Sequence, residues 1–186
     1  ANYALDSLGK KMLGDQALSI LNASIYNINP QNFERLEKAN TKNDTYYEEL
    51  RVYLDSVRQK TGCKYLYTIT LTPDKQYIRY IVDGNIPSSS EFSDYNKTEH
   101  ISTFPKNIES VFITGNSLVS DIYETDNWGA LISAFLPIKT TDNRIVGVIA
   151  CDYSAAAVKE RANGLKKFII IANISIILTL IIFSLF

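Results

Sequence analysis

The sequence predicts an α+β domain built on one antiparallel sheet and followed by an apolar helix. Three observations carry this prediction: helical periodicity in residues 1–60, strand-like patterns between residues 64 and 153, and an uncharged run at the C-terminal end. A block of helices followed by a block of strands is typical of the α+β class. The 186 residues are enough for one such domain.

The first block is predicted to contain three helices. Apolar residues recur at spacings of three and four in residues 1–28, and Pro30 ends that helix because the residue before a proline disfavours the helical conformation. A short helix is expected over 30–39 and a third over 44–60. Asp44 is expected to cap the third helix, and Gly62 lies where a C-terminal cap belongs.

The second block is predicted to contain five strands. Residues 64–71 and 76–82 are rich in aromatic and β-branched residues and flank a turn, which indicates a hairpin. A loop-rich stretch over 84–117 separates the hairpin from strands expected at 118–123, 130–139 and 144–153. A helix is expected to begin at Ser154 and to continue to the end.

The last segment, residues 168–186, carries no charged residue. As a helix it is about 28 Å long, close to the ~30 Å hydrocarbon core of a bilayer. We therefore predict a membrane-spanning helix at 166–186, with residues 1–165 as an extracellular domain; a buried core helix is the alternative. Lys166 and Lys167 favour the opposite orientation by the positive-inside tendency, so charge alone does not fix the topology.

Composition argues against several classes of function. With 19 basic and 20 acidic residues the net charge is −1, which does not suit a nucleic-acid-binding face. His100 is the only histidine, and no phosphate-binding or dinucleotide motif is present, so we expect no enzyme, no cofactor and no metal. The acidic group Asp121, Glu124 and Asp126 is most simply a solvated face, with a calcium site as the alternative.

Two stretches resemble the strands of Cache sensor domains. Residues 128–138 (WGALISAFLPI) resemble the fourth strand of these domains, and residues 146–153 (VGVIACDY) resemble the last strand, which commonly ends in Asp. The resemblance covers residues 1–165 and matches the single-module form. It implies a five-stranded antiparallel PAS-like sheet of order 2-1-5-4-3, under a long N-terminal helix and short helices.

The resemblance also implies a function. Cache domains are extracellular sensors in bacterial and archaeal chemoreceptors, histidine kinases and cyclases, so we expect a membrane-bound sensor that binds a small metabolite and pairs as a homodimer through its N-terminal helix. The Arg-x-Trp-Tyr signature of the amino-acid-binding subset is absent, which puts amino-acid specificity in doubt. The alternative is a membrane-anchored adhesion or structural ectodomain without a ligand.

The family's ligand site lies between the sheet and the loop before the third strand. Carried over by position, the resemblance implies seven ligand-binding residues: Tyr67, Arg79, Tyr123, Trp128, Ser133, Phe135 and Asp152. Asp152 suits an amine or hydroxyl, or else caps the exit helix, whereas Arg79 suits a carboxylate or else faces solvent on an edge strand. The aromatic residues fit a pocket wall or the core, so an organic acid, an amino acid and an amine all stay open as ligands.

The two cysteines, Cys63 and Cys151, are expected to be free thiols. In the family's sheet order, strictly alternating strand directions make strands one and five parallel. Cys63, before strand one, and Cys151, near the end of strand five, would then lie too far apart for a disulfide.

Overall fold

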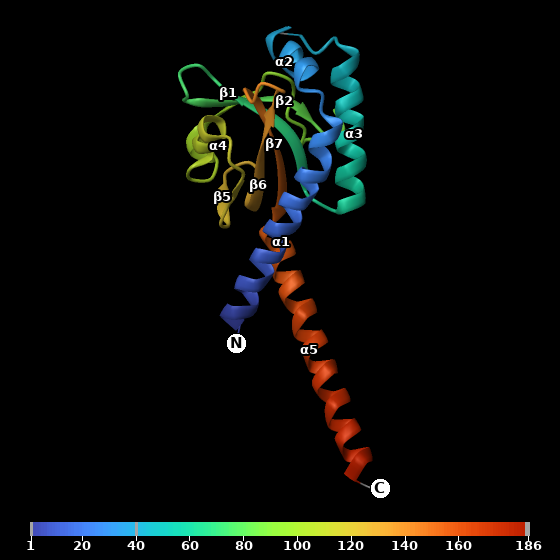
Figure 1. Ribbon diagram of the computed structural model, residues 1–186. Coiled ribbons are helices and arrows are strands. Elements are labelled where there is room, and N and C mark those ends of the chain that lie inside the picture. Colours follow the sequence, from blue (N-terminus) through green and yellow to red (C-terminus); the bar gives the residue numbers. More distant parts are fainter. Residues whose placement is uncertain (1, 40, 185–186) are drawn as a thin grey trace.

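The structure is a computed structural model that describes residues 2–39 and 41–184 (Figure 1). Within these ranges the side chains of residues 2–6, 158–159, 161–162 and 178–184 are outside the description.

The predicted helices are present. They are α1 (Asn2–Ser24) with a short 3-10 turn η1 (Ile25–Asn27), α2 (Pro30–Ala39), α3 (Thr45–Thr61) and α5 (Ala155–Ser184). Two short helices, η2 (Ile101–Thr103) and α4 (Ile108–Thr114), lie within the stretch expected to be rich in loops. The side chain of Asp44 accepts a hydrogen bond from the Tyr46 N–H group, and Gly62 adopts the left-handed conformation that ends α3. Both predicted caps are therefore confirmed.

The sheet has seven strands rather than the five predicted. They are β1 (Tyr65–Leu71), β2 (Tyr77–Asp83), β3 (Thr98–His100), β4 (Leu118–Val119), β5 (Tyr123–Thr125), β6 (Gly129–Lys139) and β7 (Ile145–Ser154). Their order is β3-β2-β1-β7-β6-β4, with β5 also paired to β6. The predicted order is therefore correct for the strands it contained. The strand predicted at 118–123 is divided into β4 and β5, and the polar strand β3 adds an edge.

The expected separation of the two cysteines was wrong. Strands β1 and β7 are antiparallel, with Tyr65 opposite Asp152 and Leu66 opposite Cys151. The chain between β2 and β4 crosses over and preserves the strand direction, so directions do not simply alternate along the sequence. The start of β1 therefore lies beside the end of β7, and Cys63 and Cys151 belong to one buried cluster, both as free thiols.

Two apolar clusters cover the two faces of the sheet. Helices α1, α2 and α3 pack on one face, where Phe33, Leu36 and Leu54 are among the fully buried side chains (Figure 1). The segment from β3 to α4 packs on the other face, over a cluster rich in aromatic residues. The second face is the one that carries the candidate site.

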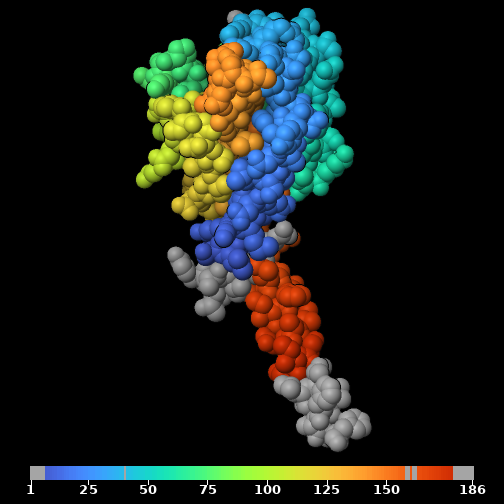
Figure 2. All heavy atoms as spheres, in the orientation of Figure 1, coloured from blue at the N-terminus to red at the C-terminus, as the bar shows by residue number. Residues whose placement is uncertain are grey.

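Helix α5 begins where β7 ends and leaves the domain beyond α1 (Figures 1 and 2). The residues exposed on its outer part are mostly apolar, including Phe168, Ile170, Ile171 and Ile174. Within the described residues, however, no helix combines the length and the apolar character needed to cross a membrane. The span predicted at 166–186 is thus not found there, and its residues 178–186 lie outside the described side chains.

Candidate functional site

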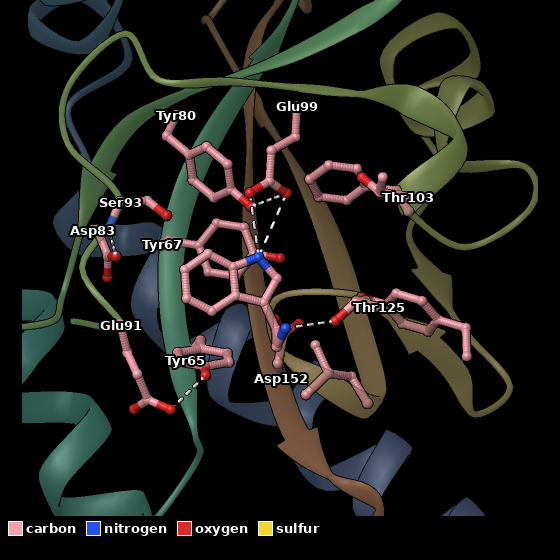
Figure 3. Close-up of a pocket in the computed structure, with 14 residues that line it drawn as sticks. Tyr65, Tyr67, Tyr80, Asp83, Glu91, Ser93, Glu99, Thr103, Thr125 and Asp152 are labelled. Carbon is pink, nitrogen blue, oxygen red and sulfur yellow. Dashed lines mark hydrogen bonds between the residues drawn. The ribbon is translucent and has the colours of Figure 1, made fainter.

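A small cavity lies between the sheet and the segment that follows β2 (Figure 3). We call residues 84–104 the lid, because they cross over this face of the sheet. The cavity is lined by Tyr65, Tyr67, Tyr80, Asp83, Glu91, Ser93, Glu99, Thr103, Phe104, Tyr123, Thr125, Trp128, Leu131 and Asp152. Its free volume is about 20 Å³, room for about one water molecule. A larger ligand therefore requires a side chain or the lid to move.

A β-bulge in β2 aims two of these side chains into the cavity. Thr68 pairs with Val82 and Ile69 pairs with Tyr80, so Ile81 is an extra residue in the ladder. Without the bulge, Tyr80 and Asp83 would point to opposite faces, because side chains alternate along a strand. With the extra residue, both line the cavity.

Asp152 lies at the bottom of the cavity and is only 2% exposed. Its backbone pairs with Tyr65 on one side and Ser133 on the other, so the flanking strands fix its position. Burial raises the pKa of Asp152 to about 7, although the nearby hydroxyls of Ser133 and Tyr67 lower it. Its Oδ1 atom has no hydrogen-bond partner among the described residues. A buried acceptor without a partner costs free energy, and a donor on a ligand removes that cost.

A second buried carboxyl group, Asp83, holds the start of the lid. Its Oδ1 accepts the N–H of Asn85 at 2.8 Å, and its Oδ2 accepts the N–H of Ser93 at 2.7 Å. Burial raises the pKa of Asp83 to about 6, although these two backbone donors lower it. Both oxygens of Asp83 thus already accept backbone N–H groups, whereas Oδ1 of Asp152 has no partner among the described residues.

Aromatic side chains form most of the cavity wall. The ring centres of Tyr65 and Trp128 are 5.5 Å apart, and those of Tyr67 and Tyr80 are 5.4 Å apart. Burial raises the pKa of Tyr67, Tyr80 and Tyr123, so these phenols stay neutral at ordinary pH. The cavity therefore offers aromatic faces to an apolar or cationic group.

Two lysines at the edge of the cavity are already paired. Lys64 donates to the Trp128 carbonyl at 3.0 Å and lies 3.5 Å from the Glu91 carboxylate. Lys97 lies 3.3 Å from the Glu99 carboxylate. Against these two cations the cavity has four lining carboxyl groups: Asp83, Glu91, Glu99 and Asp152.

The structure brings four of the seven predicted residues to the cavity, namely Tyr67, Tyr123, Trp128 and Asp152. Ser133 lies beneath the wall, fully buried, with its hydroxyl 2.9 Å from that of Tyr123. Phe135 is a fully buried member of the aromatic cluster and does not line the cavity.

Arg79 is not at the cavity. It precedes the bulge on the opposite face of β2, where it is paired with Glu37 of α2 and hydrogen-bonded to Asn96. Arg79 therefore does not offer its guanidinium group to a ligand carboxylate in the cavity.

The sequence prediction missed Tyr65, Tyr80, Asp83 and the residues of the lid. Tyr65 is two residues from Tyr67, so strand alternation alone placed it on the same face. Asp83 ends an apolar strand, and Asp152 lies near the end of another. An acidic residue in such a place is costly to bury without a partner, so the signal that marked Asp152 was also present at Asp83. The lid residues Glu91, Ser93, Glu99, Thr103 and Phe104 carried no comparable signal.

No protein family model and no curated protein matches the chain. Among solved structures, the E. coli DcuS sensor domain matches with a TM-score of 0.55 and 13% identity, over 84% of this chain and 98% of that one. The periplasmic sensory domain of the Campylobacter jejuni chemoreceptor Tlp1 matches with a TM-score of 0.51 and 9% identity. That match covers 82% of this chain and 58% of that one. The chain has the fold of these sensor domains.

A third structure extends the comparison. An extracellular ligand binding receptor from Desulfohalobium retbaense matches with a TM-score of 0.52 and 14% identity, over 85% of this chain and 26% of that one. The chain therefore spans nearly all of the DcuS sensor domain but about a quarter of this receptor. The α+β fold on one antiparallel sheet that the resemblance implied is confirmed, although the sheet has seven strands rather than five.

Proposed function

We propose that the protein is the ligand-binding domain of a signal-transduction receptor, and that the cavity under the lid is its ligand site. The observation that carries this proposal is Asp152, which lines the cavity and whose fully buried Oδ1 atom has no hydrogen-bond partner among the described residues. A buried carboxyl oxygen without a partner costs free energy. The alternative, an adhesion ectodomain without a ligand, gives no reason for this cost. Binding without catalysis is part of the same proposal.

The lining of the cavity favours an amine as the ligand. Four carboxyl groups line the cavity, whereas both nearby lysines are paired with carboxylates. Arg79, the group expected to hold a ligand carboxylate, is on the other face of the sheet and paired with Glu37. The sequence left organic acids, amino acids and amines open as ligands. The described lining residues offer no unpaired cation to the carboxylate of an organic acid or amino acid. An amine, in contrast, finds both negative charge and aromatic faces in the cavity.

A route for the signal begins at Asp152 itself. Strand β7 ends at Ser154 and α5 begins at Ala155, so Asp152 is three residues before the start of the exit helix α5. A ligand that binds one arrangement of β7 and α5 more tightly than the other shifts the population between them. Small displacements of a packed helix are a common form of such switching.

The location of the domain is a further part of the proposal. The names of two matching structures describe a periplasmic and an extracellular domain, and this supports a position outside the cytoplasm for the chain. Pairing of two copies through α1 stays a prediction, which analytical ultracentrifugation of the whole chain tests.

A thermal-shift screen of the whole chain at pH 8 tests the proposed function. The panel contains organic acids, amino acids, amines and purines, and an amine is expected to bind. At 100 times its dissociation constant a ligand adds about 2.7 kcal/mol of stability, which raises the unfolding midpoint by roughly 5–10 °C for a chain of this size. The matched control is Asp152→Asn, which should lose the shift. A panel with no hit contradicts the proposal.

A further inference from the structure

We infer that Lys97 of the lid occupies a cation subsite at the edge of the cavity, and that the cationic group of the ligand displaces it. The inference rests on the proposed function and adds two things to it. It adds a cation subsite to the Asp152 carboxyl group as part of the site that receives the ligand, and it names the contact that binding must break.

The ammonium group of Lys97 is surrounded by residues that line the cavity. Its Nζ lies 4.5 Å from the centre of the Trp128 ring and 5.7 Å from that of Tyr80. It lies 3.3 Å from a Glu99 carboxylate oxygen and 3.4 Å from the Ser93 hydroxyl. Aromatic faces with a carboxylate alongside are what a protein uses to hold an organic cation.

The subsite is held in place independently of Lys97. The Trp128 indole N–H points to the Glu99 carboxylate at 3.3 Å, and the Tyr80 hydroxyl donates to the same carboxylate at 3.2 Å (Figure 3). Glu99 therefore keeps two donors when the ammonium group leaves. The three groups that would receive a ligand cation are in this way preorganised.

The backbone of Lys97 is anchored while its side chain can leave. The Tyr80 N–H donates to the Lys97 carbonyl at 2.9 Å, and the Asn96 N–H donates to the Tyr80 carbonyl at 2.9 Å. These two bonds continue the pairing of β2 and β3 to the two lid residues that precede β3. The Lys97 side chain is 37% exposed, so rotation into solvent opens the subsite without unpairing the lid.

The free volume of the cavity is small while Lys97 covers its edge. About 20 Å³ is open in this structure, too little for an organic ligand. Withdrawal of the ammonium group uncovers the faces of Trp128 and Tyr80 for a ligand cation. The ligand class that fits is an organic cation whose charged group competes with the ammonium group of Lys97.

A titration with choline chloride, followed by the fluorescence of Trp128, tests the inference. Trp128 is the only tryptophan, so its emission reports on the subsite directly. In the whole chain, Lys97→Met is expected to bind choline about tenfold more tightly than the original protein, the size of one desolvated cation–aromatic contact. Sodium chloride at equal ionic strength provides the baseline. Lys97→Gln, which keeps a polar side chain, should show the same direction.

Two controls separate the inference from simpler effects. Lys42→Met also removes a lid ion pair, that of Lys42 with Asp94 at 2.6 Å, but away from the cavity, and should leave choline affinity unchanged. The neutral choline isostere 3,3-dimethylbutan-1-ol should gain no affinity in Lys97→Met. Equal gains for choline and this alcohol, or no gain for choline in either variant, would overturn the inference. If amines bind in the screen but Lys97 has no effect, the proposed function survives; if nothing binds, both fail.

Discussion

At the scale of single residues, the candidate site depends on how two similar carboxyl groups differ. Asp83 and Asp152 each end an apolar strand, and both are nearly fully buried. Asp83 accepts two backbone N–H groups of the lid, whereas one oxygen of Asp152 is without a partner among the described residues. The first carboxyl group therefore organises the cavity, and the second is available to a ligand.

The pKa of Asp152 makes the stability of the protein depend on pH. Its pKa is raised from 3.8 to about 7, so between these values the folded protein binds more protons than the unfolded chain. Stability is then lost as pH rises through this window. Asp152→Asn removes the effect, and its stability advantage over the original protein should grow by about 2 to 3 kcal/mol from pH 5 to pH 8.

Urea unfolding of both proteins at the two pH values measures this difference. Because the comparison is between two pH values, the different contacts of Asn and Asp largely cancel. If the difference in the free energy of unfolding between Asp152→Asn and the original protein were the same at pH 5 and pH 8, burial would not disfavour the charged form of Asp152.

At the scale of elements, the long strands were predictable and the short ones were not. β1, β2, β6 and β7 are apolar and flanked by turn residues, so pattern alone located them. β3 is a polar three-residue edge strand whose sequence carries no strand signal, and it forms because it lies beside β2.

The bulge in β2 explains why the site was only partly predictable. If side chains alternated strictly along β2, Arg79 and Asp83 would lie on the same face of the sheet. Because Ile81 is an extra residue in the strand, they lie on opposite faces. Asp152, Tyr67, Tyr123 and Trp128 were found because they lie on regular strands or next to them. The lid residues reach the cavity through tertiary packing, which no local pattern encodes.

The packing of α2 on β7 makes a prediction at this scale. A Cβ atom on Gly147 would lie 2.4 Å from the Phe33 ring and 3.1 Å from the Ile69 carbonyl oxygen. Gly147→Ala should therefore force α2 away from the sheet and destabilise the fold by about 1 to 3 kcal/mol. Differential scanning calorimetry measures the change.

Gly164→Ala is the matched control for this substitution. No described atom lies within 4 Å of the position that a Cβ atom would take at this residue of α5, and alanine favours a helix over glycine by about 1 kcal/mol. The control should thus be neutral or stabilising. A Gly147→Ala variant as stable as this control would show that α2 does not pack closely on β7.

At the scale of the whole molecule, both thiols are sealed between β1, β7 and the helices. Cys63 is 4% exposed and Cys151 is fully buried. We expect neither to react with a thiol reagent in the folded protein, and both to react when the protein unfolds globally. Labelling with Ellman's reagent across a urea gradient measures this. Rapid labelling of either cysteine without urea would show local opening at the junction of β7 and α5.

In the proposed function, the same junction of β7 and α5 carries the signal away from the ligand site. Asp152 of β7 lines the cavity and α5 begins directly after β7, so a ligand that engages Asp152 contacts the strand that continues into the exit helix. The resemblance predicted this arrangement from the last strand, whereas the occupied cation subsite emerges only from the three-dimensional contacts of Lys97.

The most direct test of the proposed site is the affinity of an amine identified in the screen, measured by calorimetric titration at pH 6 and pH 8. An Asp152 with a pKa of about 7 is mostly protonated at pH 6 and mostly ionised at pH 8. We predict that the affinity rises about tenfold between the two pH values in the original protein, and that Asp152→Asn binds weakly at both. Equal affinity at both pH values, with the Asn variant binding as tightly as the original, would contradict a ligand site built on Asp152.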